Sequence, residues 1–309
     1  MIANLFSKTR PINYIIISVV LFLFYFLYQS NETSLTNNFS TIILKSGIFV
    51  VLLVSFIIFN FFVLGNNLTK VNNFGLLLFS IFFILFPRIF GNLDVLIAHF
   101  FLLLSLRRLI ALQNLKFTKE KIFDASFWIF IAALFHFWCI VYIILVFISI
   151  IFHVSKNYKN WIIPFLAFFA VAILTLLIDL IFKSNLLKSI YNDMTISFKF
   201  SYFENIYQNI ALAIFSAVAL LFFLYALLDL SNKPLNMQIT FKKIIFAFLL
   251  GVLIYMLSNH KNNSFLIFCF APLSILGANF LEKIATPWMK ETTLYLLTLI
   301  AISIFLIQL

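Results

Sequence analysis

Long apolar runs recur along this chain from end to end, and they decide what it can fold into. Each run is roughly 15 to 25 residues long, and a helix needs about 20 apolar residues to cross a hydrocarbon core about 30 Å thick. Only 10% of the 309 residues are charged, whereas a soluble domain carries about 25%. The sequence therefore predicts an all-α polytopic membrane protein.

The runs leave no space for a soluble domain, because the longest segments between them are about 107–123 and 183–205. We therefore predict a single transmembrane domain over 1–309. No cleavage site with small residues follows the first run, so we expect a retained span and not a signal peptide. The expected spans are about 12–28, 42–64, 75–87, 95–112, 161–182, 206–230, 244–257, 264–281 and 292–309.

The apolar run 125–152 is interrupted in its middle by His136, Phe137 and Trp138. It is long for one span and short for two, so it is either one tilted helix or a short helical hairpin. Lys and Arg accumulate in cytoplasmic loops. With the N-terminus in the cytoplasm, a hairpin places 15 of these residues inside and 6 outside, whereas a single span gives 12 and 9. The charges favour the hairpin, for about 10–11 membrane segments in a bacterial inner membrane.

The net charge of +11 has the same explanation, since the charges lie in short loops between spans. We predict no nucleic-acid partner, and anionic membrane lipids are the natural counter-charge. Cys139 and Cys269 both lie in apolar runs, where cysteine behaves as a small apolar residue. No cofactor and no metal site are predicted, although a divalent cation stays open as an alternative.

In the hairpin arrangement, most polar residues outside the basic loops share the outer face. Glu32 and Asp94 are the candidate catalytic bases, and Arg88 is a candidate ligand for a phosphate. Each has a plainer alternative: a solvated loop residue for Glu32, a helix cap for Asp94 and an interface anchor for Arg88. The other candidates for binding a substrate or a lipid phosphate are Asn92, His136, His260 and Lys261.

Structural interpretations are also available for His136, Asp124 and Asp179. His136 lies between aromatic residues and is expected to be a hydrogen-bonded packing histidine more than a proton carrier. Asp124 directly precedes an apolar run and is predicted to cap a helix. Asp179 is four residues from Lys183 on one helix face, which favours an ion pair over an intramembrane functional site.

The chain resembles an uncharacterised family of bacterial multi-pass inner-membrane proteins of flavobacterial type, which carries only a domain-of-unknown-function label. The residues that carry this resemblance are Phe6-Ser7-Lys8-Thr9-Arg10-Pro11-Ile12-Asn13, Leu106-Arg107-Arg108-Leu109 and Phe123-Asp124-Ala125-Ser126-Phe127-Trp128. The resemblance covers most of the chain and implies no activity.

Segment 94–182 is also similar to the core of GT-C-type glycosyltransferases. It has a span, a basic loop, a hairpin with a polar tip at His136, and a span led by Trp161 and Pro164. Such enzymes transfer a sugar from a polyprenyl-phosphate carrier on the outer face, with an acidic residue in the first outer loop. The resemblance implies that role for Glu32.

Two functions from different classes follow. The first is a protein of cell-envelope biogenesis that acts as a GT-C-like transferase on a lipid-linked sugar donor. The second is a non-catalytic membrane subunit of an envelope assembly or secretion complex, with protein partners in the membrane. A transporter is the third alternative. Whether the chain is an enzyme stays open.

Overall fold

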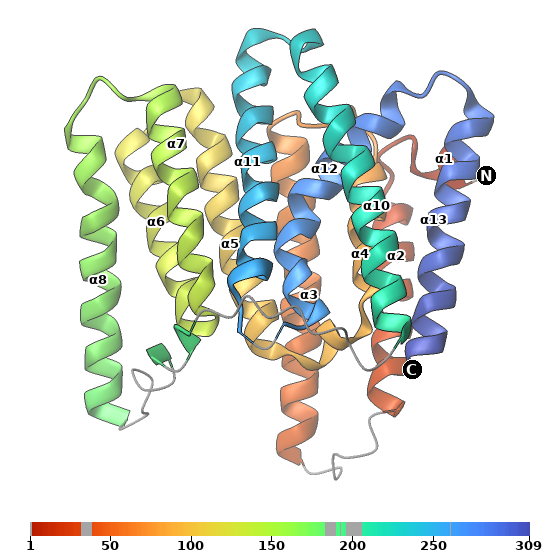
Figure 1. Ribbon diagram of the computed structural model, residues 1–309, viewed down its shortest axis with the longest axis horizontal. Helices are drawn as coiled ribbons and strands as arrows, with labels where there is room; N and C mark the ends of the chain where they lie inside the picture. Colours follow the sequence, from red (N-terminus) through yellow and green to blue (C-terminus); the bar gives the residue numbers. More distant parts are fainter. Residues whose placement is uncertain (1, 32–38, 183–189, 192, 196–205, 260) are drawn as a thin grey trace. The chain divides into compact units, whose positions relative to one another are not determined.

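The computed structural model describes residues 2–31, 39–182, 190, 191, 193–195, 206–259 and 261–309. The regular structure of these residues is helical throughout, with no strand (Figure 1). The helices, in chain order, are α1 (Ile2–Phe6), α2 (Pro11–Asn31), α3 (Phe39–Gly65), α4 (Phe74–Leu85), η1 (Pro87–Gly91), α5 (Leu93–Ala111), η2 (Leu112–Asn114), α6 (Thr118–Phe135), η3 (Phe137–Tyr142), α7 (Ile143–His153), α8 (Lys159–Phe182), α10 (Ile206–Asp229), η4 (Leu230–Asn232), α11 (Leu235–Leu257), η5 (Asn263–Leu266), α12 (Ile267–Lys283) and α13 (Pro287–Gln308).

Eight helical segments are long and apolar enough to cross a membrane. Two shorter apolar segments, Phe74–Leu85 and Phe137–His153, lie between these eight in the sequence. Helix α6, which precedes Phe137–His153, is a further helix of 18 residues. The prediction of an all-α polytopic membrane protein is confirmed.

The predicted hairpin is present. The chain leaves the helical conformation at His136, with φ −145° and ψ 104°, and continues through η3 into α7. Figure 1 shows α6 and α7 running side by side in opposite directions. A hairpin returns the chain to the side from which it came, which is the arrangement that the count of Lys and Arg favoured.

The described chain forms two compact units. Unit 1 contains Met1–Leu96, Ser201–Leu228 and Phe270–Leu309, and unit 2 contains Ile97–Phe200 and Asp229–Cys269. Each unit is therefore assembled from separate stretches of sequence.

The core of unit 1 is α4, in which all twelve residues are buried. A helix that is apolar all round is stable only where protein or lipid surrounds it. Here protein does so: α2, α3 and α13 pack against α4, and rings from α10 and α12 join them. Phe79 stacks on Phe59 at 4.4 Å, while Phe82 contacts Phe215 at 5.4 Å and Phe270 at 5.7 Å.

In unit 2, the hairpin packs against α8 on one side and α11 on another. Phe130, Ala167 and Val171 form a buried cluster between α6 and α8. On the other side, the buried Tyr142 hydroxyl donates a hydrogen bond to the Ala247 carbonyl at 3.1 Å. This bond fixes η3 against α11.

Two helix starts differ from the prediction. Helix α6 begins at Thr118, so Asp124 lies inside it and the predicted cap is wrong. Asp124 instead forms an ion pair with Arg108, with Oδ2 3.0 Å from Nη2, and this pair joins α6 to α5. Helix α11 begins at Leu235 and not near residue 244. Lys243, which the prediction placed in the loop before the helix, lies inside the helix and is fully buried.

The C-terminal end of α5 explains how Lys243 can be buried within α11. The last four carbonyls of a helix have no partner within the helix. Lys243 Nζ donates to the Leu109 carbonyl at 2.6 Å, and Lys121 Nζ donates to the Ala111 carbonyl at 2.7 Å. Both ammonium groups also face the negative end of the helix dipole.

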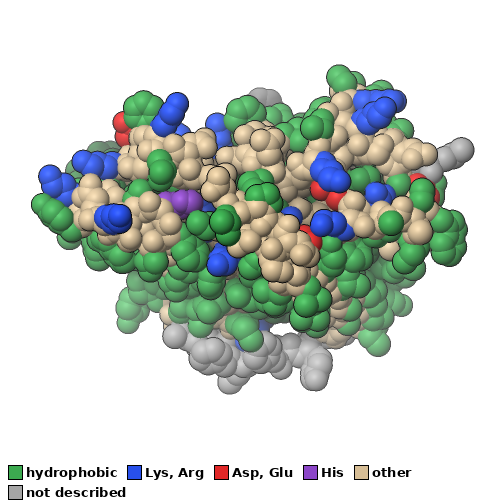
Figure 2. All heavy atoms as spheres, turned by 90° about the horizontal axis from the view of Figure 1, so that it is seen from above, with side chains coloured by type: hydrophobic (Ala, Val, Ile, Leu, Met, Phe, Trp, Pro, Cys, Tyr) green, Lys and Arg blue, Asp and Glu red, His purple; other side chains and the backbone are tan. Residues whose placement is uncertain are grey.

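One side of each unit carries most of the Lys and Arg residues; we call it the basic side. Figure 2 shows Lys and Arg side chains on the face seen from above. Exposed members in unit 1 are Lys8, Arg10, Lys70 and Lys283, and in unit 2 they are Arg108, Lys116, Lys119, Lys156 and Lys159.

Candidate functional site

Arg88 lies in η1, the connection between α4 and α5 on the side of unit 1 opposite the basic side (Figure 1). Its side chain is exposed. Gln208, at the start of α10, is only 4% exposed. With its amide oxygen turned toward Arg88, as the hydrogen bonds require, Gln208 accepts from Nη2 at 2.5 Å and from Nε at 2.8 Å. A buried amide thus orients an exposed guanidinium.

Asn92 and Asp94 follow Arg88 on the same connection. Asn92 ends η1: its N–H donates to the Ile89 carbonyl, and its carbonyl accepts from Leu96 N–H at the start of α5. Asp94 is exposed and lies in the first turn of α5, one position inside the helix. A carboxylate there is stabilised by the positive end of the helix dipole.

The connection therefore presents a cation, an amide and a carboxylate within seven residues of unit 1. Guanidinium groups bind phosphate through paired N–H donors, and a carboxylate can accept a proton from a hydroxyl. Glu32, the other candidate base, lies outside the described residues, as does His260.

His136 in unit 2 packs between rings. Its imidazole stacks on Phe265 with centroids 4.5 Å apart and on Phe268 at 5.5 Å. Its Nε2 is 2.9 Å from Ser258 Oγ. These contacts match the expected packing histidine.

Lys261 lies in the short connection between α11 and η5 of unit 2 and is half-buried. Burial lowers the pKa of its ammonium group.

The candidate site residues are divided between the two units. Arg88, Asn92 and Asp94 lie in unit 1, whereas His136 and Lys261 lie in unit 2.

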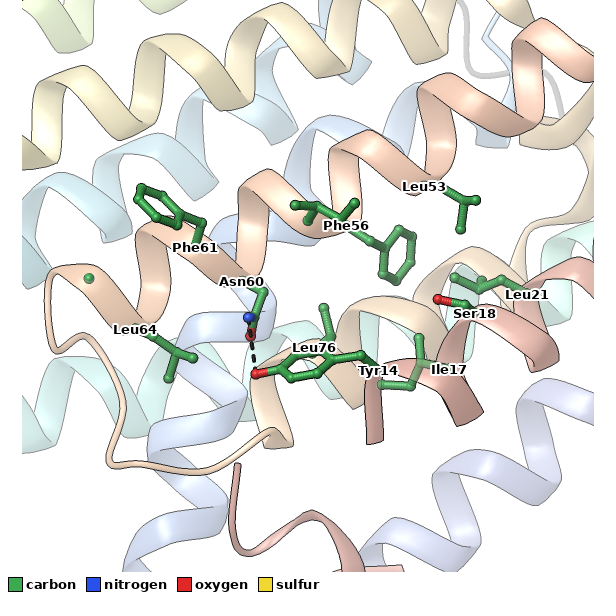
Figure 3. Close-up of a pocket in the computed structure, with 12 residues that line it drawn as sticks. Tyr14, Ile17, Ser18, Leu21, Leu53, Phe56, Asn60, Phe61, Leu64 and Leu76 are labelled. Carbon is green, nitrogen blue, oxygen red and sulfur yellow. Dashed lines mark hydrogen bonds between the residues drawn. The ribbon is translucent and has the colours of Figure 1, made fainter. Parts of the chain in front are cut away.

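A groove that the sequence did not predict lies between α2 and α3 of unit 1, with a volume of about 720 Å³ (Figure 3). Near one end, Asn60 Nδ2 donates a hydrogen bond to the Tyr14 hydroxyl at 3.2 Å. Ser18 adds one more polar group. Most of the remaining wall is apolar, and includes Ile17, Leu21, Leu53, Phe56, Phe61 and Leu64.

The groove and η1, which carries Arg88, contact α2 at different levels. Tyr25 fills the intervening level, with its hydroxyl bound to the Lys45 carbonyl at 2.7 Å and its ring 5.8 Å from Phe90 of η1. A ligand at Arg88 and a chain in the groove would therefore make independent contacts.

Among the described residues, no group of three or more His, Cys, Asp or Glu side chains is arranged to hold a metal ion. Cys139 and Cys269 are both buried free thiols, as expected for apolar positions.

The model of a family of unknown function, DUF6427, matches residues 1–309. The chain belongs to this family. No curated protein matches the chain, and no solved structure matches it. Membership of the family confirms the resemblance to an uncharacterised family, and it assigns no chemistry to Arg88, to Asp94 or to the groove.

Proposed function

We propose that this protein binds the phosphate group of a lipid-linked substrate at the outer face of a bacterial inner membrane and serves cell-envelope biogenesis. The observation that carries the proposal is Arg88, which is exposed but oriented by the buried Gln208. Holding a flexible side chain in one geometry lowers the entropy that binding costs. The lipid-linked substrate of this proposal is a polyprenyl-phosphate carrier.

The finer form of the proposal is a GT-C-like transferase. A sugar would pass from the lipid phosphate to an acceptor hydroxyl, whose proton Asp94 or Glu32 would accept. Asp94 supports this form because its exposed carboxylate lies six residues from Arg88, on the same connection. Asn92, between them, supplies an amide for orienting the donor.

The test is binding of a polyprenyl phosphate to the full chain in nanodiscs, measured by native mass spectrometry. We expect Arg88→Gln to weaken binding by about tenfold or more, because a charge-assisted contact is lost. We expect Gln208→Leu to weaken it less, because the guanidinium remains but is no longer held. Lys70→Gln, an exposed lysine on the basic side, is the matched control and should bind normally. Unchanged binding by Arg88→Gln would refute the proposal.

Transfer is tested separately with a fluorescent polyprenyl-phosphate-linked sugar. We expect Asp94→Asn or Glu32→Gln to lower transfer while binding persists. If both variants transfer at the wild-type rate, the catalytic form is wrong even where lipid binding holds.

A second candidate function is that of a non-catalytic membrane subunit, and the side-chain contacts in unit 2 favour it. There His136, Arg108 and Asp124, the residues the sequence made most conspicuous, all have structural contacts. Purification in mild detergent with mass spectrometry of bound proteins tests this candidate. It requires a stoichiometric partner and tolerance of both Glu32→Gln and Asp94→Asn.

A further inference from the structure

A second pocket, of about 540 Å³, lies on the basic side of unit 2. It opens where α6 begins, α7 ends and α8 begins. Thr118 of α6, His153 of α7 and Asn160 of α8 line it, together with Ser155 and Lys156 from the connection between α7 and α8. The pocket is distinct from the connection that carries Arg88, which belongs to unit 1.

Asn160 carries a buried acceptor atom that lacks a hydrogen-bond donor among the described residues. The side chain is only 2% exposed, and its Nδ2 donates to the Val154 carbonyl at 3.1 Å. Within the described part of the chain, nothing donates to its Oδ1. His153 Nε2, on the same wall, is buried and likewise has no partner among those residues. Buried polar atoms are nearly always hydrogen-bonded, so a ligand with a hydroxyl would satisfy this wall.

The rim of the pocket is strained. Leu115, which lines the pocket, and Phe117 have φ values of 51° and 52°, in the left-handed region that residues with a Cβ adopt at a cost of about 1 kcal/mol or more each. Both side chains are exposed, at 59% and 72%. Two exposed apolar side chains flanking Lys116 are typical of a loop at the boundary between lipid chains and head groups.

The charge of the surroundings selects the ligand. Lys156 lines the pocket, and Lys116, Lys159 and Glu120 are exposed close to it in the sequence, so the local charge is positive. No Asp or Glu is among the described residues that line it. The occupant should therefore be an anion that also carries a hydroxyl.

We propose that this pocket binds a phosphate ester with a free hydroxyl, in the form of the head group of an anionic glycerophospholipid such as phosphatidylglycerol. The phosphate lies at Lys156, and a rotation of the buried Asn160 side chain brings its Oδ1 to the head-group hydroxyl, which donates to it. The proposal does not depend on Arg88 or on the function proposed for unit 1. A soluble phosphate ester has the same recognition chemistry, and the experiment separates the two sources.

The full chain in an uncharged detergent is titrated with dioctanoyl phosphatidylglycerol, dioctanoyl phosphatidylcholine or glycerol 3-phosphate, and complexes are counted by native mass spectrometry. We expect phosphatidylglycerol to bind at least about tenfold more tightly than phosphatidylcholine, which has no hydroxyl in its head group and no net charge. Lys156→Gln and Asn160→Leu should each reduce that affinity by about tenfold. Lys70→Gln should leave it unchanged.

The outcomes separate cleanly. Lys156 is exposed, so its variant should fold even if Asn160→Leu does not. Binding of phosphatidylglycerol without binding of glycerol 3-phosphate supports a lipid site. Tight, Lys156-dependent binding of glycerol 3-phosphate would transfer the site to a soluble ester and overturn the assignment to lipid. Equal affinity for phosphatidylcholine, or wild-type affinity in the Lys156→Gln protein, would overturn the pocket as a phosphate site.

Discussion

At the scale of single residues, Gly251 shows how closely α11 approaches the start of α12 in unit 2. A Cβ at this position would lie 2.8 Å from the Phe268 carbonyl oxygen and 2.9 Å from Cys269 Sγ. Backbone atoms cannot move aside as a flexible side chain can, so only glycine fits.

We expect Gly251→Ala to lower the free energy of unfolding by about 1 to 3 kcal/mol, as overpacking in a filled core does. Gly47→Ala is the control, because nothing lies within 4 Å of the Cβ it would add. It should be neutral or stabilising by up to about 1 kcal/mol, because alanine is the better helix former. Unfolding in mixed micelles measures both, and equal losses would contradict the close approach.

His136 gives a second prediction at this scale. If stacking on Phe265 and Phe268 is its main contribution, His136→Phe keeps most of it and should cost about 1 kcal/mol from the lost hydrogen bond. His136→Ala removes the ring and should cost about 3 kcal/mol or more. The same unfolding assay compares them. Similar losses for Phe and Ala would show that the bond to Ser258 matters more than packing.

The sequence predicted the packing role of His136 because the residue lies among aromatic neighbours. It could not predict Lys243, whose partner is the Leu109 carbonyl, 134 residues earlier. Nothing local distinguishes a lysine that binds a distant helix end from one that faces solvent. Gln208 was missed for the same reason, because its partner Arg88 lies 120 residues earlier in the chain.

At the scale of elements, the hairpin of α6, η3 and α7 is the feature on which the sidedness of all later segments depends. Its two arms are too short to be recognised by length alone, and the charge count was needed to predict it. The start of α11 was mispredicted because Lys242 and Lys243 resemble a loop when their environment is unknown.

Cysteine labelling tests the hairpin in intact cells. We expect Phe137→Cys, at the tip, to react with a membrane-impermeant maleimide from outside. Asn157→Cys, in the connection after α7, should react only after the membrane is opened. The native Cys139 and Cys269 are buried and should give little background. Labelling of both positions from the same side would show that 125–152 crosses the membrane differently.

At the scale of the whole molecule, eight helical segments of the described chain are long and apolar enough to cross a membrane, and two shorter apolar segments lie between them. The sequence predicted about 10–11 membrane segments because each is an apolar run. It did not predict the groove between α2 and α3, since the volume depends on how Tyr14, Asn60 and Phe56 pack against one another.

Reporter fusions check the orientation that the Lys and Arg distribution favours. With the N-terminus in the cytoplasm, alkaline phosphatase fused after Leu309 should be active, and green fluorescent protein fused there should stay dark. A fusion after Lys116, on the basic side, should give the reverse pattern and serves as the control. Fluorescence from the Leu309 fusion would mean that the chain is inverted or that one segment does not cross.

The arrangement of unit 1 sets an order of events in time. The buried α4 leaves the ribosome early, but Phe215, Phe270 and the packing surface of α13 belong to stretches made more than 120 residues later. Until then the aromatic faces of α4 have only early neighbours and lipid. During synthesis, the first helices of unit 1 are therefore in the membrane before their later packing partners have been made. In that interval insertion factors or proteases can bind their unpacked surfaces.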